Sequence, residues 1–121
     1  MQARDGTHLQ PTMDPKKLFQ AHEIIRKHAN EREFPAQLQS IFLYIAYKGD
    51  VGQEDIIDGT GMSKSSVSRN VSWLGPVNKL KRRSGLRWVE IYQDPRPDFW
   101  RHKRIRLTAL GRQIIKEISE I

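Results

Sequence analysis

Residues 59–74 combine hydrogen-bond donors and positive charge in one short segment. Ser63 is placed to cap a helix, because its hydroxyl can accept a hydrogen bond from an otherwise unpaired N–H of the first turn. Val67, Val71 and Leu74 follow at helical spacing and give that helix an apolar stripe. Its other positions are polar or basic, with no acidic residue: Lys64, Ser65, Ser66, Ser68, Arg69 and Asn70. Such a helix suits the DNA major groove, where phosphates line the walls and base edges carry the sequence information. The alternative is an ordinary surface helix with a serine-rich face.

Within this helix, two residues are predicted to contact bases. Arg69 suits guanine and Asn70 suits adenine, because each can form a pair of hydrogen bonds with that base edge. We expect contacts with phosphates, or with water near the bases, from Lys64, Ser65, Ser66 and Ser68.

Positive charge is concentrated directly after this helix. Residues 79–106 contain ten Lys or Arg and three acidic residues, so this window carries the whole net charge of +7. Charge gathered in this way is typical of a protein that binds a polyanion. The basic run from Lys79 to Arg83, in which Lys81, Arg82 and Arg83 are the candidate contacts, should add non-specific affinity with a steep salt dependence.

The sequence predicts neither an enzyme nor a metal or cofactor site. It contains no cysteine, which excludes disulfides and thiolate ligands. His22 and His28 are six residues apart on one predicted helix and do not share a face. No glycine-rich phosphate loop or nucleophile elbow is present. No apolar run approaches the length of a membrane span and residues 1–13 lack a signal-peptide core, so we expect a cytoplasmic protein without membrane contacts.

The expected architecture is a mainly α-helical domain with a small β-hairpin, preceded by a disordered arm at residues 1–13. The domain spans residues 14–121, with helices expected over 14–31, 35–48, 53–58 and 63–74, and a short strand at Val51. Residues 53–74 form a helix-turn-helix, in which the first helix braces the second against the groove. Gly75-Pro76 ends the second helix, unless one further turn continues through Val77 and Leu80.

A hairpin and a last helix complete the predicted domain. Alternating apolar residues predict strands over 88–92 and 103–107, which form a wing spanning residues 86–107. Four basic residues are placed to grip the flanking backbone or the minor groove: Arg96, Arg101, Lys103 and Arg104. Thr108 caps a final helix whose isoleucine-rich stripe continues to Ile121. Helices 14–32 and 108–121 are therefore predicted to pack together and form a homodimer, the alternative being that both pack only on their own core.

From Leu38 to about Ile118 the chain resembles the MarR-type winged helix-turn-helix regulators. Three segments carry the resemblance: Gly61-Met62-Ser63-Lys64-Ser65-Ser66-Val67-Ser68-Arg69, the wing segment opening with Asp94-Pro95, and Ile105-Arg106-Leu107-Thr108-Ala109-Leu110-Gly111-Arg112. The resemblance implies a dimeric, sequence-specific protein that binds double-stranded DNA and usually represses transcription. It also implies that the terminal helices build the dimer interface.

The chain departs from that family in three places. The wing is about two residues longer, which makes Arg101 the better match to the family's wing-tip arginine and Arg96 the second choice. Gly75-Pro76 interrupts the segment leading to the wing, and residues 79–85 are longer and more basic. The terminal helix is also shorter than usual. Two other functions remain open: a replication-initiation or mobile-element DNA-binding protein, and a winged-helix protein-interaction module. The sequence does not identify an operator or a small-molecule effector.

Overall fold

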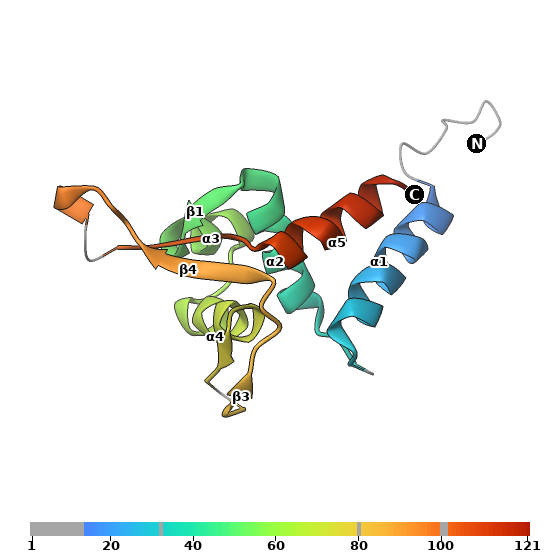
Figure 1. Ribbon diagram of the computed structural model, residues 1–121, viewed down its shortest axis with the longest axis horizontal. Helices are drawn as coiled ribbons and strands as arrows, with labels where there is room; N and C mark the ends of the chain where they lie inside the picture. The colour runs from blue at the N-terminus through green and yellow to red at the C-terminus, as the bar shows by residue number, and fades with distance from the viewer. Residues whose placement is uncertain (1–13, 32, 80, 100–101) are drawn as a thin grey trace.

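The computed structural model describes residues 14–31, 33–79, 81–99 and 102–121. The predicted arm at residues 1–13 lies outside them, as does Arg101. Figure 1 shows a helical body from which two hairpins project. The elements, in chain order, are α1 (Pro15–Ala29), α2 (Ala36–Lys48), β1 (Asp50–Gly52), α3 (Gln53–Thr60), α4 (Lys64–Leu74), β2 (Val77–Asn78), β3 (Arg83–Ser84), β4 (Val89–Gln93), a 3-10 turn (Pro97–Phe99), β5 (Lys103–Leu107) and α5 (Ala109–Ser119).

A three-stranded antiparallel sheet supports the wing. Its strand order is β1-β5-β4, and Ile105 at its centre pairs with Val51 on one side and Ile91 on the other. Strands β4 and β5 extend beyond the body as the long hairpin of Figure 1. The wing is therefore tied to the helix-turn-helix through β1, the strand that leads directly into α3.

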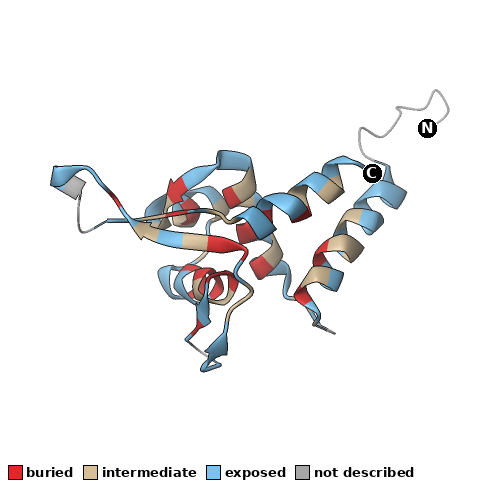
Figure 2. Ribbon diagram, in the orientation of Figure 1, coloured by how far each residue is buried: buried red, intermediate tan, exposed pale blue. Residues whose placement is uncertain are grey.

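The core forms around α2 and the residue that precedes β4. Four side chains of α2 are fully buried, as its wide apolar face predicts: Leu38, Ile41, Phe42 and Ile45. Trp88 packs beside Phe42 with the ring centroids 4.9 Å apart, and Phe34 lies 5.6 Å from the same tryptophan. Buried segments of α2, α4 and β4 face one another in Figure 2. The α4 helix is thus seated on an apolar core.

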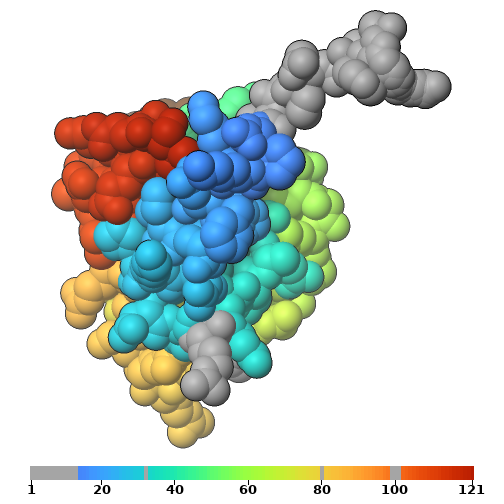
Figure 3. Space-filling view, turned by 90° about the vertical axis from the view of Figure 1, so that its right-hand side faces the viewer, coloured from blue at the N-terminus to red at the C-terminus, as the bar shows by residue number. Residues whose placement is uncertain are grey.

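The two terminal helices lie side by side on one end of the molecule, as Figure 3 shows. Ile25 of α1 and Ile114 of α5 are buried between them, and the His28 imidazole lies 3.0 Å from the Glu117 carboxylate. Leu18 and Phe19 of α1 remain exposed, Phe19 by 65%. The predicted pairing of these helices within one chain is therefore present, and apolar surface is left over.

The predicted fold class is confirmed, with two differences in detail. Val77 does not extend the recognition helix but begins β2, which pairs with β3 in a second, short hairpin. Ile91, expected to face inward, is 39% exposed because it lies where the wing leaves the body.

Candidate nucleic-acid interface

The α4 helix begins at a well-formed turn after α3. Gly61 ends α3 in the left-handed region with φ +73°, which glycine adopts without a steric penalty. Ser63 is the N-cap of α4, and its Oγ accepts a hydrogen bond from the backbone N–H of Ser66 at 3.1 Å. The Ser63 cap was predicted from the sequence, whereas α3 runs two residues further than the predicted helix before Gly61 ends it.

Burial divides α4 into an inner and an outer face. The inner face includes Ser66 and Asn70, each only 7% exposed, beside Val67, Val71 and Leu74. The Ser66 hydroxyl donates to Gln37 Oε1, and Asn70 Nδ2 donates to the Ser66 carbonyl at 2.8 Å. These two side chains contribute to the packing of α4 on the core. A base or phosphate contact by either residue would require its side chain to leave this position.

The outer face of α4 carries the remaining predicted contacts. Lys64, Ser65, Ser68 and Arg69 are all exposed, and all lie in the first two turns. The last turn is different, since Ser72 and Trp73 are partly covered by the chain that follows. The accessible reading surface is therefore the N-terminal half of the helix.

No carboxylate interrupts the sequence around this face. Between Asp58 and Glu90 the chain has no acidic residue, and it carries seven basic ones: Lys64, Arg69, Lys79, Lys81, Arg82, Arg83 and Arg87. The segment that forms α4 and β2–β3 therefore supplies positive charge without any acidic residue of its own, which suits an interface with phosphates.

The basic run after α4 forms the β2–β3 hairpin. Asn78 pairs with Arg83 across residues 79–82, where Arg82 adopts the left-handed φ of +52° at the turn. Lys81 and Arg82 are exposed, and the Lys81 ammonium group lies 5.2 Å from the centre of the Trp73 ring. Arg83 instead forms a 2.7 Å ion pair with Glu31, just after α1. Of the three predicted contacts here, only Arg83 is held by a carboxylate among the described residues.

In the wing, two of the predicted basic residues are held by acids. Arg96 forms a bidentate ion pair with Asp94, with contacts from 2.6 to 3.2 Å. This hydrogen bonding lowers the pKa of the Asp94 carboxyl from 3.8 to about 2. Arg104 pairs with Asp50 at 3.0 Å, on the side facing β1. Lys103 is exposed at the start of β5. Arg96 and Arg104 thus help to shape the wing, while Lys103 remains exposed.

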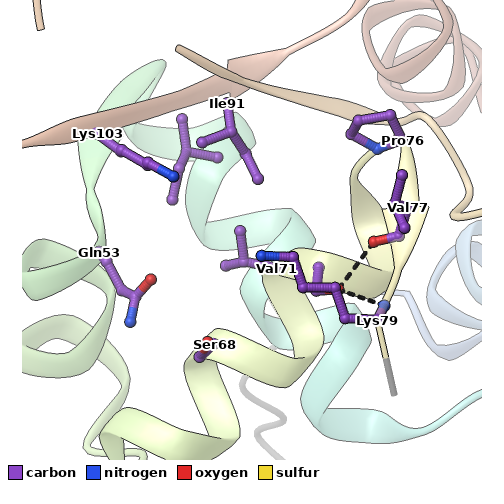
Figure 4. Close-up of a pocket in the computed structure, with 10 residues that line it drawn as sticks. Gln53, Ser68, Val71, Pro76, Val77, Lys79, Ile91 and Lys103 are labelled. Carbon is purple, nitrogen blue, oxygen red and sulfur yellow. Dashed lines mark hydrogen bonds between the residues drawn. The ribbon is translucent and has the colours of Figure 1, made fainter. Parts of the chain in front are cut away.

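Wing, hairpin and recognition helix together enclose a crevice of about 330 Å³. Its floor is apolar and its rim is basic; the lining residues are Gln53, Ser68, Val71, Ser72, Pro76, Val77, Lys79, Ile91, Lys103 and Ile105. Figure 4 shows Lys79 and Lys103 reaching into it from opposite sides, above Ser68 of α4. The sequence predicted Lys79 as the start of the basic run that adds non-specific affinity, without assigning it an individual contact.

Within the described ranges, no group of three or more His, Asp or Glu side chains is arranged to hold a metal ion. Across the same part of the chain, no helix has both the length and the hydropathy needed to cross a bilayer.

Comparison with known proteins gives a consistent result at the level of structure. No family model matches the chain, and no curated protein matches it by sequence. Among solved structures, MarR matches with a TM-score of 0.59 at 17% identity, covering 87% of this chain and 69% of that one. A mutant MarR from E. coli, complexed with operator DNA, matches with a TM-score of 0.56 at 12% sequence identity. The match covers 87% of this chain and 67% of that one. The PcaV transcriptional regulator from Streptomyces coelicolor, in complex with its natural ligand, matches with a TM-score of 0.56 at 18% sequence identity. The match covers 93% of this chain and 74% of that one. The resemblance inferred from the sequence is confirmed for the fold: the chain has the winged helix-turn-helix fold of MarR-type transcriptional regulators.

Proposed function

We propose that this protein is a dimeric transcriptional regulator that binds specific sites in double-stranded DNA, most simply as a cytoplasmic repressor. The observation that carries the proposal is the outer face of α4. Its first two turns expose Lys64, Ser65, Ser68 and Arg69, within a stretch of the chain that has no carboxylate. The MarR structure with operator DNA, although only 12% identical, supports the same use of this fold.

In this proposal the N-terminal half of α4 enters the major groove. Arg69 is the residue we assign to a base, since a guanidinium can donate two hydrogen bonds to guanine. Lys64, Ser65 and Ser68 contact phosphates or ordered water. The wing reaches the flanking backbone or minor groove through Lys103, with Arg96 near its tip.

The dimer is supported by the apolar surface that the terminal helices leave uncovered. Leu18 and Phe19 of α1 and Leu110 of α5 are exposed. Three isoleucines of the C-terminal segment, Ile115, Ile118 and Ile121, are only partly covered. A second subunit placed against this end would bury these side chains and present two α4 helices to half-sites about 10 base pairs apart.

The test begins with binding of the purified protein to a pool of random duplexes at low salt, followed by selection of the bound sequences. We expect an enriched site with two related halves, and light scattering should give a mass of two 14.1 kDa chains. No binding at low salt would reject the DNA-binding function. A monomeric mass at high concentration would reject the dimer.

The role of Arg69 is tested on the selected site. Arg69→Ala should weaken specific binding by roughly 5- to 150-fold, which corresponds to about 1–3 kcal/mol for a bidentate base contact. It should also relax the preference at one position of each half-site. If affinity for selected and random duplexes falls equally, Arg69 contacts only the backbone. Mapping the bound sites to promoters or to an origin then separates repression from a replication role.

A further inference from the structure

The geometry points to the β2–β3 hairpin as a second DNA-contact element, which binds backbone phosphates at the C-terminal end of α4. This inference rests on the proposed DNA-binding function and extends it. The wing formed by β4 and β5 is the hairpin expected of the fold, whereas β2–β3 is an additional one between it and α4. Figure 1 shows the two hairpins projecting in different directions from the body.

The charges at the hairpin tip are available to an external anion. Lys81 and Arg82 are exposed, and no carboxylate among the described residues forms an ion pair with either. Arg83, one residue further on, has its charge compensated by Glu31 at 2.7 Å. The tip therefore presents uncompensated positive charge, and its stem is tied back to the body.

The hairpin is fixed rigidly to the recognition helix. The Ser72 hydroxyl donates to the Val77 carbonyl at 2.8 Å and accepts from the backbone N–H of Lys79 at 2.9 Å, the contacts dashed in Figure 4. On the returning strand, the N–H of Leu86 donates to the Trp73 carbonyl at 2.8 Å. Both strands of the stem are thus hydrogen-bonded to the last turn of α4, next to which the tip is held.

The position of the hairpin matches a wall of the major groove. The 11 residues of α4 span about 16 Å, whereas the groove is about 12 Å wide. If the N-terminal residues read the bases, the C-terminal end lies over a phosphate strand. The hairpin contacts Ser72 and Trp73 in that last turn, and Lys79 faces Lys103 of the wing across the crevice. One protomer would therefore hold the backbone on both sides of its reading surface.

The experiment compares salt dependence on the selected duplex. In the double variant Lys81→Gln and Arg82→Gln, the slope of log affinity against log salt should become shallower by about 2, since each lost phosphate contact contributes about 0.9. Lys48→Gln is the control, because Lys48 is an exposed cation at the C-terminal end of α2, where its ammonium group lies 4.8 Å from the centre of the Tyr47 ring. It removes one charge and should leave the slope unchanged.

Ethylation interference then locates the contacts. A group of phosphates that wild-type protein requires should become dispensable for the double variant, and it should differ from the group lost in a Lys103→Gln wing variant. An unchanged slope and interference pattern in the double variant, with wild-type binding intact, would overturn the second contact while leaving the DNA-binding function standing. Absence of wild-type binding would instead reject the function itself.

The variants also separate DNA from an acidic protein partner. Both substituted side chains are exposed, so the melting temperature should change little, and Arg82→Gln alone provides the same comparison if the double variant is unstable. For that single variant the expected change in slope is about 1. An unchanged slope together with loss of a co-purifying acidic protein would overturn the DNA contact.

Discussion

The close approach of Gly85 to α4 makes a sharp prediction about stability. A Cβ atom at this position would lie 1.9 Å from the Gly75 carbonyl oxygen and 2.9 Å from that of Trp73, whereas real Cβ contacts essentially never fall below 3.0 Å. Because both obstacles are backbone atoms, Gly85→Ala must move the base of the hairpin away from α4 by about 1 Å.

The magnitude follows from the hydrogen bonds that this movement breaks. Three are at risk: Gly85 N–H to the Pro76 carbonyl at 3.0 Å, Leu86 N–H to Trp73 at 2.8 Å and Arg87 N–H to Gly75 at 3.1 Å. At about 0.5–1.5 kcal/mol each, their loss lowers the free energy of unfolding by about 1.5–4.5 kcal/mol. For a chain of this size, the midpoint of that range lowers the melting temperature by roughly 12 °C.

Urea and thermal unfolding, followed by circular dichroism and tryptophan fluorescence, measure the effect. Gly52→Ala is the matched control, since its Cβ would meet its nearest neighbour at an ordinary 3.5 Å. The control substitution should lower the free energy of unfolding by less than about 1 kcal/mol. If Gly85→Ala lowers the free energy of unfolding by no more than Gly52→Ala does, the base of the hairpin is not packed against α4 and the prediction is wrong.

Three further predictions concern the N-cap and two ion pairs. Ser63→Ala should lower the free energy of unfolding by about 1 kcal/mol. Ser63→Asp should restore the cap but weaken DNA binding; unchanged affinity would place the start of α4 away from phosphates. The Asp94 carboxyl should titrate near pH 2 by NMR, because Arg96 stabilises its charged form; its contribution to stability is complete above pH 3.8 and is lost as pH falls toward 2. A midpoint near 3.8 would contradict the ion pair. The hydrogen bond with His28 lowers the pKa of Glu117 below 4.5. The melting temperature of the Glu117→Gln variant should therefore depend less on pH, below pH 4.5, than that of the wild type. Identical pH profiles of the two proteins would exclude this stabilising role.

Features set by neighbouring residues could be predicted from the sequence. Ser63 and Thr108 cap their helices as expected, because a cap depends on only three or four consecutive positions. The wing strands were predicted from alternation, and Ile105 is indeed buried at the sheet centre. These local patterns were sufficient for the fold class.

Features set by packing at long range were missed. Asn70 is polar, yet on a helical wheel it lies next to Leu74, at the edge of the apolar stripe, and is buried together with that stripe. The β2–β3 hairpin has no apolar alternation, so residues 79–83 appeared only as a basic run. The ion pair between Arg83 and Glu31 joins residues 52 apart, and no sequence pattern indicates it.

The covering of the last turn of α4 limits how much sequence information one protomer can take from DNA. With only two turns of α4 available, one protomer can contact directly about four base pairs at most. A given sequence of four base pairs recurs by chance about every 256 base pairs. A genome offers on the order of a million competing positions or more. Two protomers reading about eight base pairs reduce chance matches by a further factor of about 256, and the remaining discrimination would have to come from the shape of the DNA held between the hairpins. In the proposed dimer, the second copy would therefore supply the selectivity that the covered last turn of α4 denies to one protomer.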